Sequence, residues 1–309
     1  MKFLITGGTG FVGSFLTQQL LENEHEVTVI GRSSAPVVRS GRLHAISADT
    51  TRKGSWQNAL KDVDAVINLA GMSIFHRWTS AYKQQIYDSR ILTTRHVVEG
   101  MTGDRRPQTL ISTSAVGYYG NRGDDILTEA EPCGADFLSR VGKDWEHEAF
   151  EAEKKNVRVV AARFGVVLGS SGGALKQMMT PFKWFVGGPM GSGQQWFSWI
   201  HIADLLAGLM FMLENSKIQG PVNLCSPAPV TSGELASILG AVLHRPAVIP
   251  APSIALRLIL GEFAETLLAS QRAIPEKLLK SGFVFRFPDL KDTLVDLCQS
   301  QPQPQSQSG

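Results

Sequence analysis

The sequence predicts an α/β protein built on a doubly wound parallel sheet, and three observations support this fold class. Short apolar runs alternate with helical patterns six times across the first half of the chain. Runs that are apolar throughout are typical of strands that helices cover on both faces of a parallel sheet. The first run leads into glycines spaced G-x-x-G-x-x-G, which is typical of a strand, a tight turn and a helix N-terminus. Together these features predict a Rossmann-like domain.

The second half of the chain has a different pattern, with glycine-rich loops, short helices and an aromatic stretch at 196–202. We therefore predict a Rossmann domain at 1–165, to which later segments can add strands, and a smaller α+β substrate lobe at 166–298. Residues 222–225 are predicted to be a strand. The tail at 299–309 consists almost entirely of Gln, Pro and Ser, and it is predicted to be disordered because it cannot form a packed core.

The glycine motif follows the first predicted strand, at residues 3–6. Gly7 permits a tight turn, Gly10 lets the backbone approach a pyrophosphate, and Gly13 lets the helix pack closely on the strand. An ordinary glycine-rich turn without a ligand is the alternative. The cofactor-binding residues predicted in this stretch are Gly7, Thr9, Gly10, Phe11, Val12 and Gly13.

The second predicted strand, at 26–30, ends at Gly31-Arg32-Ser33, where a dinucleotide-binding fold places the residue that contacts the adenosine ribose. Enzymes that use NAD offer an acidic residue to the 2′-hydroxyl at this point. Arg32 with Ser33 beside it instead suits the 2′-phosphate of NADP, because a guanidinium donates two hydrogen bonds to such a group. NADP(H) is therefore the predicted cofactor, and an ordinary surface arginine is the alternative.

Three further positions extend the predicted cofactor site. Asp49 follows the third strand, at 43–48, where it accepts a hydrogen bond from the adenine amino group or serves only as a turn residue. The fourth strand, at 63–71, ends in Leu69, Ala70 and Gly71, which are predicted to form a wall of the cofactor site because the small residues at this strand end leave room for it. Arg77, before the helix predicted at 79–101, is either a phosphate or substrate contact or a plain surface residue.

The composition narrows the function classes. The formal net charge is +2, so no strong field favours nucleic acid or an anionic membrane as a partner. Three widely separated cysteines lack metal-binding spacing, which predicts reduced thiols and no metal site. No apolar run approaches the roughly 18 residues of a spanning helix, and the first strand begins too early for a cleaved leader. We expect an intracellular protein, cytoplasmic by default, with a small-molecule substrate; a homodimer, organelle import and nuclear location stay open.

Longer motifs carry a family resemblance that spans nearly the whole chain. They are ITGGTGFVG at 5–13, RWT at 77–79, DSRI at 88–91, SAVGYYG at 114–120, DWE at 144–146, WFSWIHI at 196–202 and FRFPDL at 285–290. These stretches resemble the extended short-chain dehydrogenase/reductase superfamily. More narrowly, they are similar to family 39U, an epimerase/dehydratase-like group with a C-terminal domain of unknown function. The resemblance implies hydride transfer at an alcohol or ketone, and by analogy a nucleotide sugar as substrate.

The same resemblance implies a catalytic serine, tyrosine and lysine, the last two four residues apart on one helix. Ser114 matches the serine and Lys143 the lysine, but Ser139 stands where the tyrosine is expected. A serine hydroxyl is shorter and far less acidic than a phenol, so it should not replace tyrosine as the proton donor. Either Tyr118 or Tyr119, just after Ser114, supplies the acid. We predict Ser114, Tyr119 and Lys143 as the catalytic residues.

Two other outcomes stay open at this point. His147, one helical turn beyond Lys143, could assist a redox step. Alternatively, the protein binds NADP(H) without turnover and acts as a sensor or regulatory interaction protein. Three further residues bear on the site. Arg90 stands near the point where members of the superfamily carry a cofactor-contacting asparagine. His201 and Asp204 are interpreted mainly as a structural hinge between the lobes, with substrate contact as the alternative.

Overall fold

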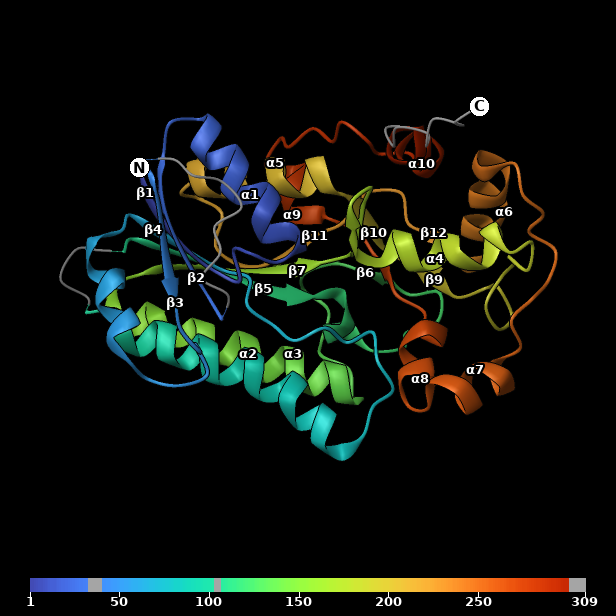
Figure 1. Cartoon of the computed structure of the whole chain (residues 1–309), viewed down its shortest axis with the longest axis horizontal. Helices are drawn as coiled ribbons and strands as arrows, with labels where there is room; N and C mark the ends of the chain where they lie inside the picture. Colours follow the sequence, from blue (N-terminus) through green and yellow to red (C-terminus); the bar gives the residue numbers. More distant parts are fainter. Residues whose placement is uncertain (33–40, 103–106, 300–309) are drawn as a thin grey trace, which may run out of the picture.

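The computed structural model, which describes residues 1–32, 41–102 and 107–299, contains a sheet of seven parallel strands (Figure 1). Its order is β11-β7-β5-β4-β1-β2-β3. The strands are β1 (Lys2–Thr6), β2 (Glu26–Gly31), β3 (Leu43–Ser47), β4 (Ala65–Asn68), β5 (Thr109–Ala115), β7 (Arg158–Phe164) and β11 (Gly220–Leu224). The predicted Rossmann-like fold is confirmed. The order reverses between β1 and β4, and ligands of such sheets bind beyond the strand C-termini at that point.

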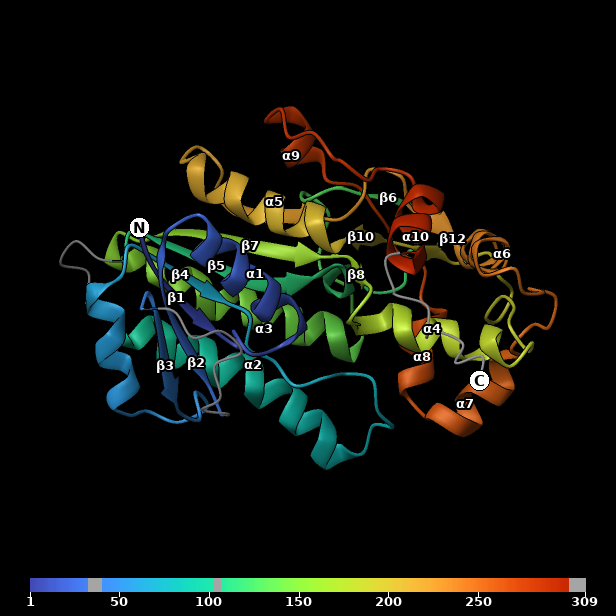
Figure 2. The same ribbon diagram turned by 45° about the horizontal axis from the view of Figure 1, so that its top comes forward.

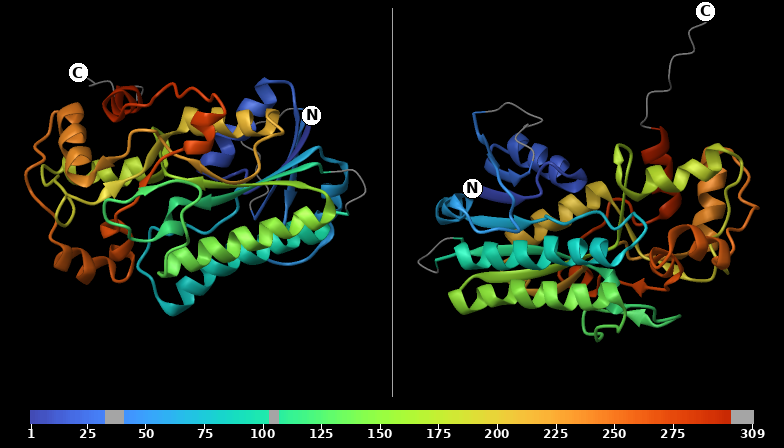
Figure 3. Two further views of the ribbon diagram at one scale, coloured as in Figure 1. Left: turned by 180° about the vertical axis from the view of Figure 1, so that it is seen from behind. Right: turned by 60° about the horizontal axis from the view of Figure 1, so that its bottom comes forward.

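Helices cover both faces of this sheet. On one face lie α1 (Phe11–Glu22) and α5 (Ile202–Glu214), whose leucines join a core cluster with residues of β1, β2 and β11. On the other face, α2 (Ser80–Gly100) and α3 (Phe137–Phe150) run side by side (Figure 3). Two short 3₁₀ segments, η1 (Ser55–Asp62) and η3 (Glu151–Lys155), complete this second layer. The apolar strands are buried because both of their faces are covered.

The last strand of the sheet, β11, comes from far along the chain. It pairs in parallel with β7, so that Val222 lies opposite Ala162 and Leu224 opposite Phe164. The run at 222–225 was predicted to be a strand, and the prediction left room for later strands in the first domain. The chain therefore leaves the sheet after β7 and returns to it some 55 residues later. The predicted domain boundary at residue 165 leaves this returning strand outside the first domain.

Most of the remaining elements form a lobe beyond the C-terminal ends of β5 and β7, whose arrowheads point toward it (Figure 2). Its helices are α4 (Gly173–Lys183), α6 (Ser232–Leu243), α7 (Ser253–Leu260), α8 (Phe263–Leu268) and α10 (Leu290–Gln299). The short helix α9 (Glu276–Lys280) instead packs against β11 at the edge of the sheet. Three strand pairs lie among them: β8 (Val166–Gly169) with β10 (Trp199–His201), β9 (Trp196–Phe197) with β12 (Val230–Thr231), and β6 (Ile126–Leu127) with β13 (Arg272–Ala273). Residues 300–309 of the predicted tail lie outside the described residues.

His201 and Asp204 attach the start of α5 to the C-terminal segment. The Asp204 carboxylate is buried and accepts hydrogen bonds from the backbone N–H groups of Arg286 and Phe287, both at 2.8 Å. The His201 ring stacks on Phe287 and bonds through Nε2 to Asp296. Burial lowers the pKa of His201, which favours a neutral ring at neutral pH. These contacts agree with a structural role for the pair.

No helix within the described residues is both long enough and apolar enough to cross a membrane. Within the same residues, no group of three or more His, Cys, Asp or Glu side chains is arranged to hold a metal ion.

We expect Asp204→Asn to lower the free energy of unfolding by about 1–3 kcal/mol, because an amide group keeps one acceptor and turns its own N–H₂ toward a backbone donor. Urea denaturation followed by circular dichroism measures this change. Glu214→Gln, an exposed carboxylate at the other end of α5, is the matched control and should change stability by less than about 0.5 kcal/mol. Equal stability of Asp204→Asn and the wild type would contradict the structural role.

Candidate functional site

The glycine turn between β1 and α1 has the geometry of an anion site. Gly7 has a φ of +68°, and the Gly10 N–H donates to the Gly7 carbonyl at 2.9 Å. A Cβ on Gly13 would lie 2.3 Å from the Gly7 carbonyl oxygen, so α1 rests directly on the turn. Gly10 is the N-cap of α1, no side chain caps this helix end, and its first turn holds no acidic residue. The first N–H groups of the helix are therefore available to a phosphate.

A cleft of about 650 Å³ opens beside this turn. It brings together eight of the predicted cofactor-binding residues: Gly7, Thr9, Gly10, Arg32, Asp49, Leu69, Ala70 and Gly71. Phe11, Val12 and Gly13 begin α1 next to it. Ser33 lies outside the described residues. A Cβ on Gly7 would be 3.0 Å from the Ala70 backbone, so the turn and the small-residue wall after β4 touch.

Sequence reasoning missed about half of the cleft lining. Thr50, Thr51 and Arg52 follow Asp49, and Gln85, Asp88, Ser89 and Thr93 project from α2. The α2 residues stand at positions i, i+3, i+4 and i+8, which places them on one helix face, and that spacing was the available signal. The Ser89 hydroxyl oxygen accepts the Met72 N–H at 3.0 Å, which joins α2 to the wall after β4.

Asp49 is held by its own loop. Its Oδ1 accepts from the backbone N–H and the hydroxyl of Thr51, at 3.1 and 2.7 Å. The hydroxyl hydrogen bond is the main reason that the pKa of Asp49 is lowered, and the charges of Arg52 and Arg32 act in the same direction. The carboxylate is therefore ionised at neutral pH and faces the cleft.

Phe11 joins the cofactor turn to the lobe. Its ring packs into three glycines of the turn between β8 and α4, and a Cβ on Gly169, Gly172 or Gly173 would lie 2.7–2.9 Å from ring atoms. No side chain other than hydrogen fits at these three positions while the ring is there. The start of α1 is thus fixed against the lobe.

Arg77 lies away from the cleft. The side chain is exposed, and it lies against Gly261 in the turn between α7 and α8, where a Cβ would be 3.6 Å from its Cγ and Nε. Its neighbours Phe75 and Trp78 pack on Phe263 with ring centroids 5.8 Å apart. The prediction of a phosphate contact is not supported, because the loop before α2 docks on the lobe.

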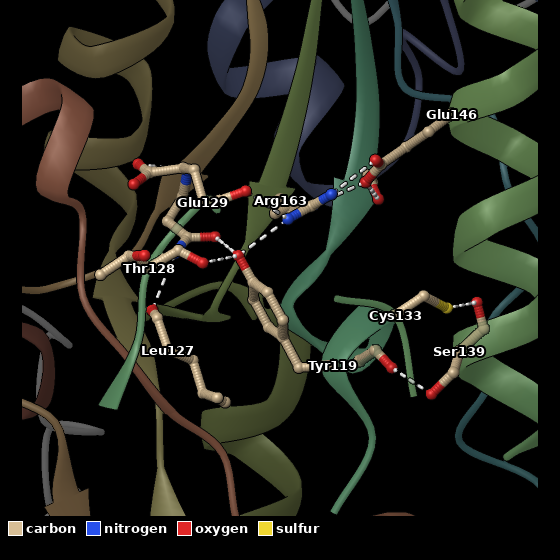
Figure 4. A network of polar contacts seen from close by, with 11 residues as sticks. Tyr119, Leu127, Thr128, Glu129, Cys133, Ser139, Glu146 and Arg163 are labelled. Atoms are coloured by element: carbon tan, nitrogen blue, oxygen red, sulfur yellow. Dashed lines mark hydrogen bonds and ion pairs between the residues drawn. The ribbon is translucent and has the colours of Figure 1, made fainter. Parts of the chain in front are cut away.

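The predicted catalytic serine joins a buried polar network around Glu146 and Arg163, and Figure 4 shows how these two side chains meet. Ser114 is 1% exposed and donates to Glu146 Oε1 at 2.6 Å. Glu146 forms a two-pronged ion pair with Arg163, at 2.7 and 2.8 Å. The Ser114 hydroxyl is therefore committed to a carboxylate inside the protein, and its predicted role of orienting a substrate oxygen is not supported by this geometry.

Tyr119 is part of the same network and is fully buried. Its hydroxyl accepts from Arg163 at 2.9 Å and points its proton toward the Thr128 carbonyl and the Asn223 side-chain oxygen (Figure 4). Burial raises the pKa of Tyr119 despite the neighbouring guanidinium. A buried phenol that is harder to ionise than usual and fully hydrogen-bonded makes a poor proton donor to a ligand. This geometry corrects the choice of Tyr119 as the catalytic acid.

Packing explains why a tyrosine does not stand four residues before Lys143. Ser139 is fully buried and donates to the Gly117 carbonyl and to Asp136. A Cβ on Gly134 would lie 2.7 Å from the Ser139 oxygen, and one on Gly120 would lie 3.0 Å from it. The loops around these glycines occupy the space that a phenol would need.

Tyr118 is the tyrosine with an open face. Its ring is partly exposed and lies 3.6 Å from the Arg163 guanidinium carbon. It packs on Gly142, where a Cβ would be 3.4 Å from Tyr118 atoms, and Gly142 precedes the exposed Lys143. Of the two tyrosines left open by the sequence, Tyr118 has the better access to a ligand.

A second cavity, of about 520 Å³, lies between the start of α3 and the lobe helices α7 and α8. Trp78 and Phe137 line it together with the carboxylates of Asp136, Glu262 and Glu265. Arg257 is the one cation among its lining residues, and it is paired with Glu265 at 2.7 Å.

Two family models match the chain, and the first covers the sheet domain together with the first part of the lobe, to the end of β11. Residues 3–225 match the model of the NAD dependent epimerase/dehydratase family, and residues 251–297 match a domain of unknown function, DUF1731. The chain belongs to the NAD dependent epimerase/dehydratase family. The resemblance found in the sequence is thereby confirmed, and members of this family give the following comparisons.

One relative is the chloroplastic homologue of epimerase family protein SDR39U1 from Arabidopsis thaliana, 40% identical over 303 residues that cover 97% of this chain and 87% of the relative. An epimerase family protein of Staphylococcus epidermidis is 36% identical over 301 residues, 97% of this chain and 99% of its own. The crystal structure of human SDR39U1 (isoform 2) with NADPH has a TM-score of 0.85 at 33% identity, with 97% of this chain and 100% of that chain covered. MoeE5 in complex with UDP-glucuronic acid and NAD shares the fold, with a TM-score of 0.78 and 19% identity over 97% of this chain and 99% of that one.

We expect Tyr119→Phe to lower the free energy of unfolding by about 1–3 kcal/mol, because buried polar atoms of Arg163 and Asn223 lose a partner. Urea denaturation is the measurement. Tyr118→Phe is the control, since the Tyr118 ring keeps its contact with Arg163 and its edge is partly exposed. Unchanged stability of Tyr119→Phe would show that the hydroxyl does not contribute to the network.

Proposed function

We propose that this protein binds NADP(H) in the cleft beside the glycine turn. The observation that carries the proposal is the position of Arg32, at the end of β2 in a cleft whose floor is the uncapped N-terminus of α1. The backbone N–H groups of α1 would hold the diphosphate, Arg32 the 2′-phosphate, and residues 69–71 the wall. The NADPH in the crystal structure of human SDR39U1, 33% identical to this chain, supports the same choice.

The proposed reaction is hydride transfer between NADP(H) and a small secondary alcohol or ketone. Bound NADPH supplies the hydride. Tyr118 is the residue proposed to move the hydroxyl proton, and Lys143 is proposed to favour its phenolate. Burial raises the pKa of Tyr118 and the charge of Arg163 lowers it, so the two cations together would have to offset the burial. This assignment replaces Tyr119 and rests on the exposure of Tyr118 and its contact with Gly142, next to Lys143.

The substrate proposed here lacks a diphosphate. A nucleotide sugar, which the family relationship supports, would bring two phosphate charges to the cavity between α3 and the lobe. Three carboxylates line that cavity, and two of them already hold the nearby cations, Glu265 pairing with Arg257 and Glu262 with Lys83. Asp136 also caps α3, which occupies a helix N-terminus that would otherwise attract an anion. A neutral hydroxyl or carbonyl compound suits this lining better.

A second function is favoured by one observation, the burial of Ser114, Ser139 and Tyr119. Because these buried hydroxyl groups do not reach a ligand, the protein would bind NADP(H) without turnover and act as a sensor of the cofactor's redox state. A homodimer and a cytoplasmic location stay predictions; the Arabidopsis relative is described as chloroplastic.

Arg32→Ala should weaken NADPH binding about 10- to 100-fold and leave NADH binding nearly unchanged, because the lost guanidinium contacts only the 2′-phosphate. Fluorescence titration with each cofactor measures this. Arg52→Ala is the matched control, since Arg52 lines the same cleft and is largely exposed. Equal losses for both cofactors, or a larger NADPH loss in the control, would reject Arg32 as the 2′-phosphate ligand.

In a screen of carbonyl compounds for NADPH oxidation, any turnover found should fall at least about 100-fold in Tyr118→Phe and in Lys143→Met. Tyr119→Phe, assayed at a temperature where it is folded, should retain most of the rate. Turnover unaffected by the first two changes would contradict the catalytic assignment. NADPH binding with no turnover across the screen would favour the sensor.

A further inference from the structure

Arg90 is a fixed cation on α2. Its Nη1 donates to the Ile86 carbonyl and its Nη2 to the Met72 carbonyl, both at 3.0 Å. The guanidinium carbon lies 5.2 Å from the centre of the Trp145 ring, which adds a cation–π contact. These contacts come from α2, α3 and the loop after β4, so the group has little freedom to move.

The charge of Arg90 is not balanced by a carboxylate. Within the described part of the chain, no ion pair with an acidic side chain includes this residue, and its hydrogen bonds go to neutral carbonyls. Burial lowers the pKa of Arg90 to about 10, which still leaves it protonated at neutral pH. A buried cation without an anionic partner lowers the stability of the fold unless another negative group compensates its charge.

A short series of contacts connects this cation to the proposed phosphate site. A Cβ on Gly7 would lie 3.0 Å from Ala70, and a Cβ on Gly71 would lie 3.1 Å from the guanidinium carbon of Arg90. Ser89 and Thr93, on the same helix, line the cleft itself. The guanidinium is thus separated from the cleft by the backbone of one glycine, on the wall that touches the glycine turn.

The charges that line the cleft cancel one another. Arg32 and Arg52 are offset by Asp49 and Asp88 among the lining residues. A dinucleotide phosphate brings several negative charges, so the positive field must come from elsewhere. The N-terminus of α1 supplies one part, and Arg90 is a nearby cation that forms no ion pair with an acidic side chain among the described residues.

We propose that Arg90 is the countercharge for the diphosphate of the bound cofactor and acts on it across Gly71. The proposal rests on NADP(H) binding as proposed above. Arg90 is a positioning residue in this scheme, since its guanidinium attracts the diphosphate through the field and holds the Met72 loop in place. The absence of a side chain at Gly71 lets the charge approach the cleft.

Three probes separate this role from a purely structural one. NADPH has both the diphosphate and the 2′-phosphate, ADP-ribose has only the diphosphate, and adenosine 2′-monophosphate has only the 2′-phosphate. Removing the charge with Arg90→Met should weaken NADPH and ADP-ribose on the order of tenfold and change adenosine 2′-monophosphate less than about twofold. Arg90→Lys, which keeps the charge, should retain most of the affinity. Arg32→Ala is the matched control and should show the reverse pattern, with ADP-ribose unaffected.

Calorimetric titration gives the affinities, and thermal melting establishes that each variant is folded. If Arg90→Met does not fold, Arg90→Gln, which keeps an N–H donor without the charge, takes its place. Equal losses of affinity for all three probes would overturn the proposal, as would equal losses in Arg90→Lys and the neutral variant. Arg90 would then serve only to hold the Met72 loop in place. Wild-type protein that binds no NADPH would overturn the proposed function as well, whereas unchanged affinity in a neutral variant would overturn this inference alone.

Discussion

The buried ion pair between Glu146 and Arg163 is the interaction on which the arrangement around the candidate active site depends. It joins α3 to β7, and both partners are at most 6% exposed. Two buried charges are tolerated only when their remaining donors and acceptors are satisfied, and here Ser114 and Tyr119 satisfy them. Removing one partner would leave the other as an unpaired buried charge and would lower the free energy of unfolding by about 3–5 kcal/mol. The hydroxyl groups expected to act on a substrate therefore serve the ion pair.

The same pair explains which group is left for chemistry. Because Tyr119 turns inward to Arg163 and Asn223, the preceding residue, Tyr118, turns its ring over the outer side of the guanidinium. Gly142 gives it room on α3. Tyr118 therefore lies in a short 3₁₀ segment, at 116–119, beside the helix that carries Lys143, and the helix itself has Ser139 where a tyrosine was expected.

The parts of the site that the sequence predicted are those fixed by local backbone geometry. Gly7 and Gly13 could be assigned because a positive φ and a helix resting on a turn leave no room for other residues. Tyr119 could not be placed, because its burial depends on Asn223, 104 residues away, in a strand that returns to the sheet late in the chain. Arg77 lies outside the cofactor cleft for a similar reason, since the residue that it lies against, Gly261, belongs to the lobe. Sequence spacing alone does not reveal which distant element will cover a loop.

Contacts with the lobe fix both sides of the cofactor cleft. On one side, the ring of Phe11 at the start of α1 packs against the glycines between β8 and α4. On the other side, the loop after β4, which forms the cleft wall, carries Phe75 and Trp78 onto Phe263 of α8. A ligand that moves α1 away from this wall must therefore disturb a lobe contact on at least one side. The contacts of Phe75 and Trp78 therefore connect the wall of the cleft to α8, which also lines the cavity beside α7.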